Sequence, residues 1–389
     1  MISFINVLKK VFSKRVESVI DLSSTITDWI NAISQLAFLI VFLLLFLGFN
    51  QRFQIYISSR NIKLKLNILE KMALDSQNKT INFLKGLGLE KPEPVVERGI
   101  NYFVIDPVNV EPTDIIKRMD ILFKTREDRI EGLLEQVVPK ASKVEKSIAV
   151  TALEIASALT LVFKYVRHYL ITGQKTNNWI LIMQLEMILP MLIKQAEAYS
   201  KALDVFLEGK PVGDGAGPLT VFKLAGPNAQ PVEIVKDTVY FETIIENRKA
   251  YLIKASGPES NVGHPGFAVE SLLNKLVNEE DKKVGMIITV DAALKLEGEP
   301  TGEVTEGAGA AIGDVGPEKI RIERAAANYG IPLHAIIVKM SMEEAILTMK
   351  KEIVDAIDKV TERIKELVKN IPEDSIIIIA GIGNSCGIR

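Results

Sequence analysis

Met286-Ile287-Ile288-Thr289-Val290 is an apolar stretch, and Asp291 follows it directly. A short run of this kind, rich in β-branched residues, is typical of a buried strand. Two later runs, 333–339 and 375–380, have the same character, and stretches of helical periodicity separate all three. Because strands and helices alternate in this way, we expect an α/β domain with a three-layer, mostly parallel sheet covered by helices on both faces.

This α/β domain is expected to occupy residues 209–389. Ser341 and Glu344 have the spacing of a capping box, which predicts where its last helix begins. Its remaining predicted elements are a hairpin with strands 235–245 and 249–255, and helices over 267–277, 318–329 and 342–368.

The N-terminal region contains an apolar segment, residues 29–49, that has about the length of one transmembrane helix. It begins late in the chain and no small-residue cleavage site follows it, which favours an anchor over a cleaved signal peptide. Residues 1–28 then form an N-terminal tail. Basic residues stand on both sides of the segment, so the positive-inside rule orients it only weakly.

Amino-acid composition indicates the cellular compartment of the protein and the kinds of partner it binds. Cys386 is the single cysteine, so no intrachain disulfide framework is expected and a reducing, cytoplasmic location of the C-terminal domain is favoured. The formal net charge is −2 and the basic residues are scattered, a pattern that does not indicate nucleic-acid binding. We therefore expect a single-pass cell-membrane protein that contacts the lipid bilayer and carries its body in the cytoplasm.

The anchor is followed by a mixed juxtamembrane segment, residues 50–145. Its pattern predicts a helix over 62–84, a short strand over 102–105 and a further helix that starts at Pro112.

Residues 146–208 are expected to form a helical hairpin, with helices at 148–169 and 179–203. Both helices are apolar, but Glu154 and Glu186 lie within them. Placing a charge in lipid costs about 2.5–3.5 kcal/mol, so a soluble hairpin packed on the α/β domain is favoured over a second membrane hairpin.

Two aspartates stand where open α/β sheets place their ligands. Asp214 lies in Gly213-Asp214-Gly215-Ala216-Gly217-Pro218, whose glycines permit positive φ angles and close approach of a ligand. Asp291 ends a predicted buried strand. The structural alternatives are a surface turn for Asp214 and a helix N-cap for Asp291. The sequence predicts a site with Asp214 and Asp291 as its acids, and the glycines that line it are Gly213, Gly215 and Gly217.

Three further segments supply candidate binding residues. The glycine-rich residues 298–316 are expected to form a long loop that walls the site. His264 precedes a predicted helix, whose N-terminal amides favour anions, and is a candidate acid, base or ligand. The chain ends in a strand that runs into Gly381-Ile382-Gly383-Asn384. The candidates from the loop and the C-terminus are Glu306, Gly307, Gly309 and Asn384.

The motifs at 213–219 and 288–294, together with the glycine-rich loop after them, resemble the spore germination protease and the related hydrogenase maturation proteases. The resemblance implies a phosphorylase/hydrolase-like three-layer fold. In that superfamily a Gly-Asn loop stands before the aspartate motif, whereas here its closest match, 376–384, comes last. We therefore predict a circular permutation, in which Asn384 lies within about 15 Å of Asp214. The whole chain also resembles an uncharacterised archaeal family with one N-terminal membrane span.

The resemblance implies that Asp214 and Asp291 are paired acids used for peptide hydrolysis or metal binding. Two carboxylates that share a proton divide the roles of acid and base, because repulsion separates their pKa values. Alternatively, they hold a divalent metal ion that activates water. The histidine that metal-using relatives carry has no match here, and Glu306 stands roughly in its place.

The predicted function is therefore a membrane-anchored, peptidase-like hydrolase that acts on a peptide or protein. The alternative is a non-enzymatic, membrane-tethered ligand-binding or scaffold protein. A transporter would require the helices within 148–203 to span the membrane.

Overall fold

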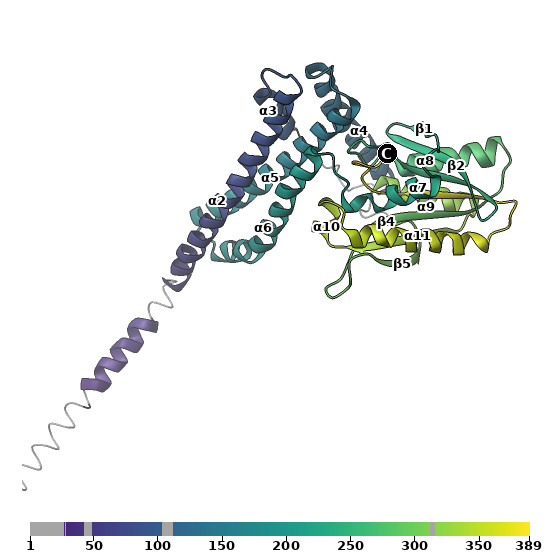
Figure 1. Ribbon diagram of the computed structural model, residues 1–389. Helices are drawn as coiled ribbons and strands as arrows, with labels where there is room; N and C mark the ends of the chain where they lie inside the picture. The colour runs from purple at the N-terminus through teal and green to yellow at the C-terminus, as the bar shows by residue number, and fades with distance from the viewer. Residues whose placement is uncertain (1–26, 28, 43–48, 103–111, 312–315) are drawn as a thin grey trace, which may run out of the picture. The chain divides into compact units, whose positions relative to one another are not determined.

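The computed structural model describes residues 27, 29–42, 49–102, 112–311 and 316–389 (Figure 1). The chain divides into two compact units. The first comprises Met1–Lys65 and Val166–Leu189, and the second comprises Leu66–Tyr165 and Pro190–Arg389. The N-terminal region is helical and the C-terminal region is α/β, as the sequence predicts.

The helical region follows the predicted order of elements. Its helices are α2 (Phe49–Gly86), α3 (Glu93–Ile100), α4 (Pro112–Val137), α5 (Lys143–Lys175) and α6 (Trp179–Leu207). The helix expected at 62–84 is part of the longer α2, and the helix expected from Pro112 is α4. Two consecutive helices, α5 and α6, cover the residues of the expected hairpin. Of the short strand expected at 102–105, all but Tyr102 lies outside the described residues.

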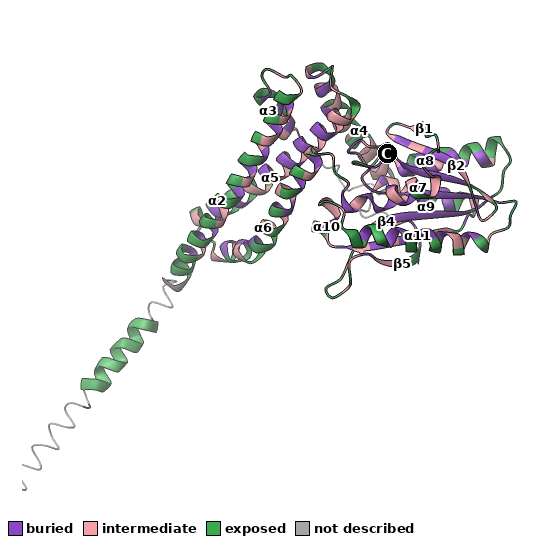
Figure 2. Cartoon of the chain, in the orientation of Figure 1, coloured by how far each residue is buried: buried purple, intermediate pink, exposed green. Residues whose placement is uncertain are grey.

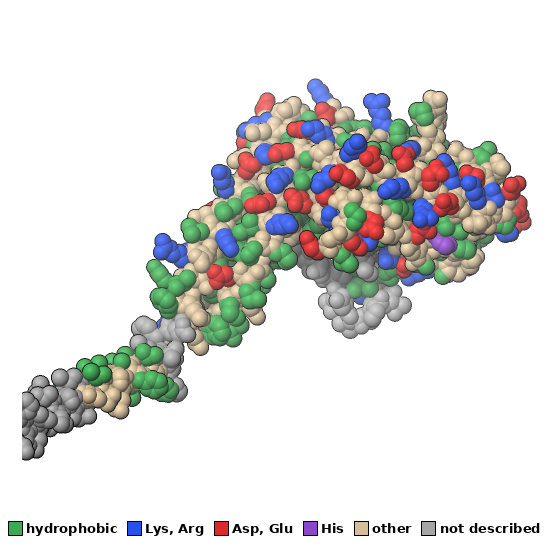
Figure 3. Space-filling view, turned by 60° about the horizontal axis from the view of Figure 1, so that its bottom comes forward, with side chains coloured by type: hydrophobic (Ala, Val, Ile, Leu, Met, Phe, Trp, Pro, Cys, Tyr) green, Lys and Arg blue, Asp and Glu red, His purple; other side chains and the backbone are tan. Residues whose placement is uncertain are grey.

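The apolar segment 29–49 is helical over Trp29–Phe42, and the side chains of this helix are exposed (Figures 2 and 3). Residues 43–48 lie outside the described part of the chain. Both α5 and α6 are long and apolar enough to cross a membrane, but core helices of soluble proteins pass the same test. Length and composition therefore suggest membrane association only weakly.

The helices of the second unit have a core of their own. Leu84 of α2, Val96 of α3, Leu134 of α4 and Leu153 of α5 are all buried in one apolar cluster. Burying a leucine side chain contributes about 1.5–3 kcal/mol, so this cluster stabilises the packing of these helices.

Within the described residues the α/β domain contains a seven-stranded sheet of order β1-β2-β3-β7-β4-β6-β5. The neighbours β3, β7, β4 and β6 are parallel, and β1, β2 and β5 are antiparallel strands at the edges. The last strand in the chain, β7, lies between β3 and β4. The strands are β1 (Val232–Val235), β2 (Thr238–Ile245), β3 (Arg248–Ala255), β4 (Val284–Leu294), β5 (Glu303–Ala308), β6 (Leu333–Met340) and β7 (Ile376–Gly381).

Helices cover both faces of this sheet. The first face packs against α7 (Ala216–Ala225) and α11 (Lys351–Lys369), and the second against α8 (Pro265–Leu273) and α9 (Pro317–Tyr329). Ile377 and Ile379 join the core of the first face, whereas Ile376 and Ile378 join the core of the second. Side chains alternate along a strand, so a strand buried on both faces must be apolar at every position.

The prediction of one long loop over 298–316 is wrong in part, because Glu303–Ala308 form the edge strand β5. Gly302 and Gly309 bound this strand with φ angles of +80° and +110°. The free edge of β6 pairs with the chain between these two turns. Glycine therefore marks the ends of a strand here instead of a continuous loop.

The single helix expected over 342–368 is interrupted. The capping box of Ser341 and Glu344 is present and starts α10 (Met342–Ile346), as predicted, but Leu347 is extended. The chain after α10 pairs with the chain before Asp214, because Gly213 N–H donates to the carbonyl of Leu347 at 3.1 Å. The break between α10 and α11 thus holds the backbone that leads into Asp214.

Candidate functional site

Asp214 lies in a single 3-10 turn, Gly213–Gly215, that leads into α7. Its Oδ2 accepts a hydrogen bond of 2.9 Å from the backbone N–H of Asn384. The two residues are 170 positions apart in the chain. The predicted proximity of Asp214 and Asn384 is confirmed, and it joins the first turn of the α/β domain to the end of its central strand.

The glycines of this site allow backbone segments to pack against one another. A Cβ on Gly217 would overlap the backbone of Ile382 and the carbonyl of Val290. Gly383 has a φ of +129°, and a Cβ there would overlap the carbonyl oxygen of Asp214. Protein atoms therefore fill the space that these two glycines leave.

Gly213 and Gly215 have the same role. A Cβ on Gly213 would overlap the carbonyl of Glu344. A Cβ on Gly215 would lie 2.9 Å from the carbonyl oxygen of Asn384. Close packing of other backbone segments against Gly213, Gly215 and Gly217 thus accounts for the three glycines of the motif.

Asp291 is buried within β4, which continues to Leu294. The expectation that Asp291 ends its strand is wrong, and so is its alternative role as a helix N-cap, because β4 continues along β6 beyond it. Val290 is the last residue of β4 that pairs with β7, and its carbonyl accepts the N–H of Ile382 at 2.8 Å. Asp291 therefore stands at the level of the sheet where β7 ends.

The two aspartates reach this edge from different faces of the sheet. Val290 packs in the core of the first face, with α7, and Ile287 packs in the core of the second. Because successive side chains of a strand point to opposite faces, the side chain of Asp291, next to Val290, points toward the second face. The turn that carries Asp214 contacts β4 but leads into α7, on the first face.

Burial raises the pKa of the Asp214 carboxyl, and the hydrogen bond from Asn384 N–H opposes this shift. Desolvation is the larger cause, so Asp214 holds its proton to a higher pH than an exposed aspartate. A carboxyl group of this kind can donate a proton as well as accept one.

Lys254 and Ser385 are polar residues of the same edge that sequence reasoning missed. Lys254 Nζ and Ser385 Oγ each donate a hydrogen bond of 2.9 Å to the carbonyl oxygen of Ala255. Lys254 is 1% exposed, and burial lowers its pKa to about 8, although the carboxylate of Glu259 opposes the shift. The sequence signal is a lysine within the otherwise apolar end of β3.

Cys386 is fully buried next to this pair. Burial raises the pKa of its thiol to about 11, and a hydrogen bond with Ser260 opposes the shift. The thiolate is therefore scarce at neutral pH, and Cys386 is inert as a nucleophile.

Two family models match the chain. Residues 36–209 match the model described as protein of unknown function (DUF1512), N-terminal domain, and residues 212–389 match the model described as domain of unknown function (DUF1512), C-terminal. The chain belongs to the DUF1512 family. No curated protein sequence matches it significantly. Asp214, Lys254, Asp291 and Asn384 all lie in the C-terminal domain of the DUF1512 chain.

The loop candidates of the DUF1512 chain lie apart from Asp214 and Asn384. Glu306 is on β5, two strands from β4, which is about 10 Å across the sheet. Its carboxylate forms an ion pair of 3.1 Å with Arg363. Gly307 and Gly309 continue toward the amino end of β6, where Gly309 N–H donates to Leu333. The structure does not bring these three residues to the Asp214 edge.

His264 belongs to a different region of the C-terminal domain. It is at the N-cap position of α8, but its side chain makes no capping hydrogen bond. The N–H groups of Gly266 and Phe267 donate to the carboxylate of Glu318 instead. The N-terminal amides of α8 are therefore already occupied by an anion from the protein.

Two carboxylates flank the His264 ring, with Nδ1 3.7 Å from Glu318 and Nε2 3.8 Å from Glu127. The Glu318 carboxylate beside the ring is the main cause that raises the pKa of His264, and desolvation opposes this shift. His264 lines a cavity of about 380 Å³, which also borders Lys143, Lys236 and Glu259.

Across the described ranges, no three His, Cys, Asp or Glu side chains gather closely enough to hold a metal ion. Asp214 already accepts a backbone hydrogen bond, and Asp291 Oδ1 accepts one from Ala292 N–H at 2.7 Å. The described residues therefore form no cluster of three such ligands around Asp214 and Asp291.

Proposed function

We propose that this member of the DUF1512 family is a membrane-anchored, peptidase-like hydrolase that acts at the carboxyl edge of its sheet. The observation that supports it best is the hydrogen bond from Asn384 N–H to Asp214 Oδ2. This contact agrees with the proposed circular permutation of a protease-like domain, as does the position of β7 beside β4. The carboxyl ends of parallel strands are where open α/β sheets bind their ligands.

Asp214 is the proposed general acid. Its raised pKa retains a proton for a leaving group at a pH where an exposed aspartate has lost it. Asp291 is the proposed partner that activates water. Because Asp214 and Asp291 reach the edge from opposite faces of the sheet, the proposal requires a substrate that lies across the edge and contacts both of them.

Lys254 and Ser385 are the proposed second pair of this site. An amine that titrates near a pH of about 8 can accept the proton of a nearby hydroxyl, so this pair offers Ser385 as a nucleophile in place of the water activated by Asp291. Both groups contact one carbonyl oxygen, so their separation cannot exceed the sum of two hydrogen bonds of 2.9 Å. Lys254 and Ser385 are both buried. The proposal therefore requires that this edge of the sheet opens to admit substrate.

The proposed anchor is the apolar segment 29–49, with the α/β domain in the cytoplasm. Its length and the exposed apolar side chains of Trp29–Phe42 support this assignment. A single cysteine that is buried and unpaired agrees with a reducing compartment.

The test is a screen of fluorogenic peptides with the full-length protein in detergent micelles. Asp214→Asn is expected to lower turnover by about 10²–10⁴-fold, the usual contribution of a general acid. Asp355→Asn is the matched control, because Asp355 is an exposed residue of α11. Turnover that is equal in the wild-type protein and in Asp214→Asn would exclude this role.

A second candidate function, a non-enzymatic ligand-binding protein, is favoured by the cavity beside His264. Glu259 is 8% exposed, and within the described structure its Oε2 has no hydrogen-bond partner. Asn261 Oδ1, in the same cavity, is likewise buried without one. Unpaired buried acceptors are costly, so the cavity fits a small ligand that donates hydrogen bonds, such as an amine.

A further inference from the structure

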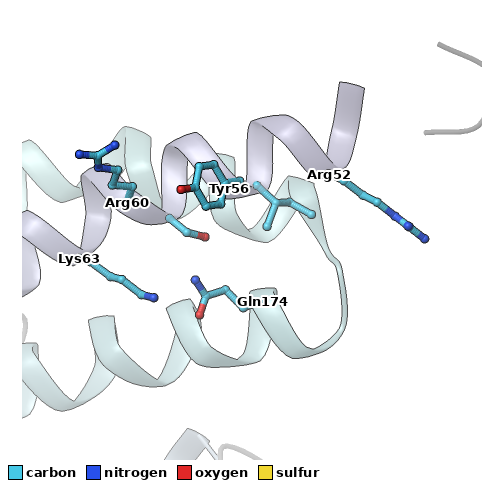
Figure 4. Close-up of a pocket in the computed structure, with 7 residues that line it drawn as sticks. Arg52, Tyr56, Arg60, Lys63 and Gln174 are labelled. Carbon is cyan, nitrogen blue, oxygen red and sulfur yellow. The ribbon is translucent and has the colours of Figure 1, made fainter. Parts of the chain in front are cut away.

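A second cavity, of about 390 Å³, lies in the first unit. It is formed by one face of α2 and the end of α5 (Figure 4). Figure 4 shows the side chains of Lys63 and Gln174 turned toward one another across this space, with Arg52 and Arg60 extending outward. We call it the basic pocket, and its lining residues are Arg52, Ile55, Tyr56, Ser59, Arg60, Lys63 and Gln174.

The described lining of the basic pocket carries positive charge. Its lining contains three cations and no carboxylate. Arg52, Arg60 and Lys63 are exposed, and in the described part of the chain none of them forms an ion pair with an acid. Since Lys and Arg carry only hydrogen-bond donors, the pocket is suited to an anion.

Ser59 provides an independent sign of a ligand. Its side chain is 3% exposed, yet its Oγ has no hydrogen-bond partner among the described residues. A buried hydroxyl without a partner is destabilising, so a ligand oxygen that accepts this hydroxyl proton removes a penalty. The amide of Gln174 supplies a further donor from α5.

The surroundings of the pocket indicate where such an anion comes from. Arg52 follows the apolar segment 29–49 by three positions, which is about 5 Å along a helix. The first unit also exposes large apolar side chains on α2 and on α6. They are Phe53, Tyr56, Ile57, Leu64, Ile180, Met183, Met187 and Ile188.

Basic residues directly beside a hydrophobic span, together with exposed apolar side chains, are typical of contact with an anionic membrane surface. We propose that the basic pocket binds a phosphate group, and that this phosphate belongs to the headgroup of an anionic lipid. The cations neutralise the phosphate, Ser59 and Gln174 donate to its oxygens, and the apolar side chains contact the acyl region.

The experiment measures binding of water-soluble dihexanoyl phosphatidic acid to the full-length protein in neutral detergent by isothermal titration calorimetry. Inorganic phosphate and dihexanoyl phosphatidylcholine are titrated in parallel. The triple variant Arg52→Gln, Arg60→Gln, Lys63→Gln is expected to bind phosphatidic acid about 100-fold more weakly, since each charge near an anionic surface contributes roughly fivefold.

The variant Ser59→Ala distinguishes binding in a defined pocket from general attraction to positive charge, because it leaves every cation in place. It is expected to weaken phosphatidic acid binding several-fold without lowering the melting temperature. The control triple variant, Lys283→Gln, Lys351→Gln, Lys359→Gln, removes the same charge from exposed positions of the α/β domain and is expected to bind like the wild-type protein.

Saturable binding of phosphatidic acid that both Ser59→Ala and the basic-pocket variant weaken supports the proposal. An equal loss of phosphatidic acid binding in the two triple variants would overturn the proposal, because net charge alone would then explain binding. If inorganic phosphate binds as tightly as phosphatidic acid, the lipid assignment is overturned. If phosphatidylcholine binds as tightly, the requirement for an anion is overturned.

Discussion

The contact between Asp214 and the C-terminal loop depends on Gly383, and the substitution Gly383→Ala tests it. Gly383 has a φ of +129°, a conformation that L side chains rarely adopt. A Cβ there would also overlap the backbone carbonyl of Asp214. The loop must therefore move away from Asp214, and the hydrogen bond from Asn384 must lengthen or break.

The magnitude follows from two contributions. A strained backbone conformation costs about 1–3 kcal/mol, and a lost hydrogen bond to a carboxyl group costs about 1–3 kcal/mol. Gly383→Ala is thus expected to destabilise the α/β domain by about 2–6 kcal/mol, the sum of the two contributions. Gly307→Ala is the control, because no heavy atom lies within 4 Å of a Cβ built at Gly307.

The assay is hydrogen–deuterium exchange of the full-length protein, read at the C-terminal peptide that contains the amide of Asn384, together with thermal unfolding. Gly383→Ala is expected to speed exchange of this amide by at least about 30-fold, which corresponds to 2 kcal/mol. Gly307→Ala is expected to leave both measurements unchanged. Exchange and melting in Gly383→Ala that match the wild-type protein would refute the proposed packing.

Three further predictions concern buried or partly buried residues with ionisable side chains. Because the pKa of Asp214 is raised in the folded protein, its contribution to stability is complete below the unfolded pKa near 3.9 and is lost as pH rises through the folded pKa. In a plot of melting temperature against pH, Asp214→Asn should therefore flatten the acid side of the curve. Curves of the wild-type protein and the variant that run parallel would contradict this prediction. Lys254 titrates at about 8 in the fold and near 10.4 when unfolded, so wild-type stability should rise by up to about 3 kcal/mol across that window, and Lys254→Met should abolish the rise in denaturation curves. Glu259→Gln should abolish any thermal stabilisation by a small diamine, and a diamine shift that survives this substitution would exclude the cavity beside His264 as its site.

Most of the fold was predictable because its signals are local. The runs 333–339 and 375–380 are apolar at nearly every position, and such runs have few uses except as buried parallel strands. The capping box at Ser341 likewise depends on residues three positions apart. These features need no knowledge of the remainder of the chain.

The predictions that proved wrong concern segments whose pairing partners lie far away in the sequence. Residues 303–308 form a strand only because β6 offers a free edge, and the helix after Ser341 breaks at Leu347 because the chain there pairs with the segment before Asp214. Neither partner is visible in a local window. Pairing along β6 also continues β4 past Asp291.

The candidate site was predicted in part for the same reason. The proximity of Asp214 and Asn384 could be predicted from the order of the motifs along the chain, because that order contains information about residues far apart in sequence. Lys254 was missed because a lysine at the end of an apolar run resembles a solvated strand end, and only the structure shows it buried beside Ser385. Glu306 was wrongly grouped with the aspartates because β5 was interpreted as a loop.

The most direct test of the hydrolase proposal is kcat/KM on the best peptide substrate, measured for the wild-type protein, Asp214→Asn, Asp291→Asn and the control Asp355→Asn. The proposal predicts losses of about 10²-fold or more in the first two variants and none in the control. Activity of Asp214→Asn within twofold of the wild-type protein would contradict it.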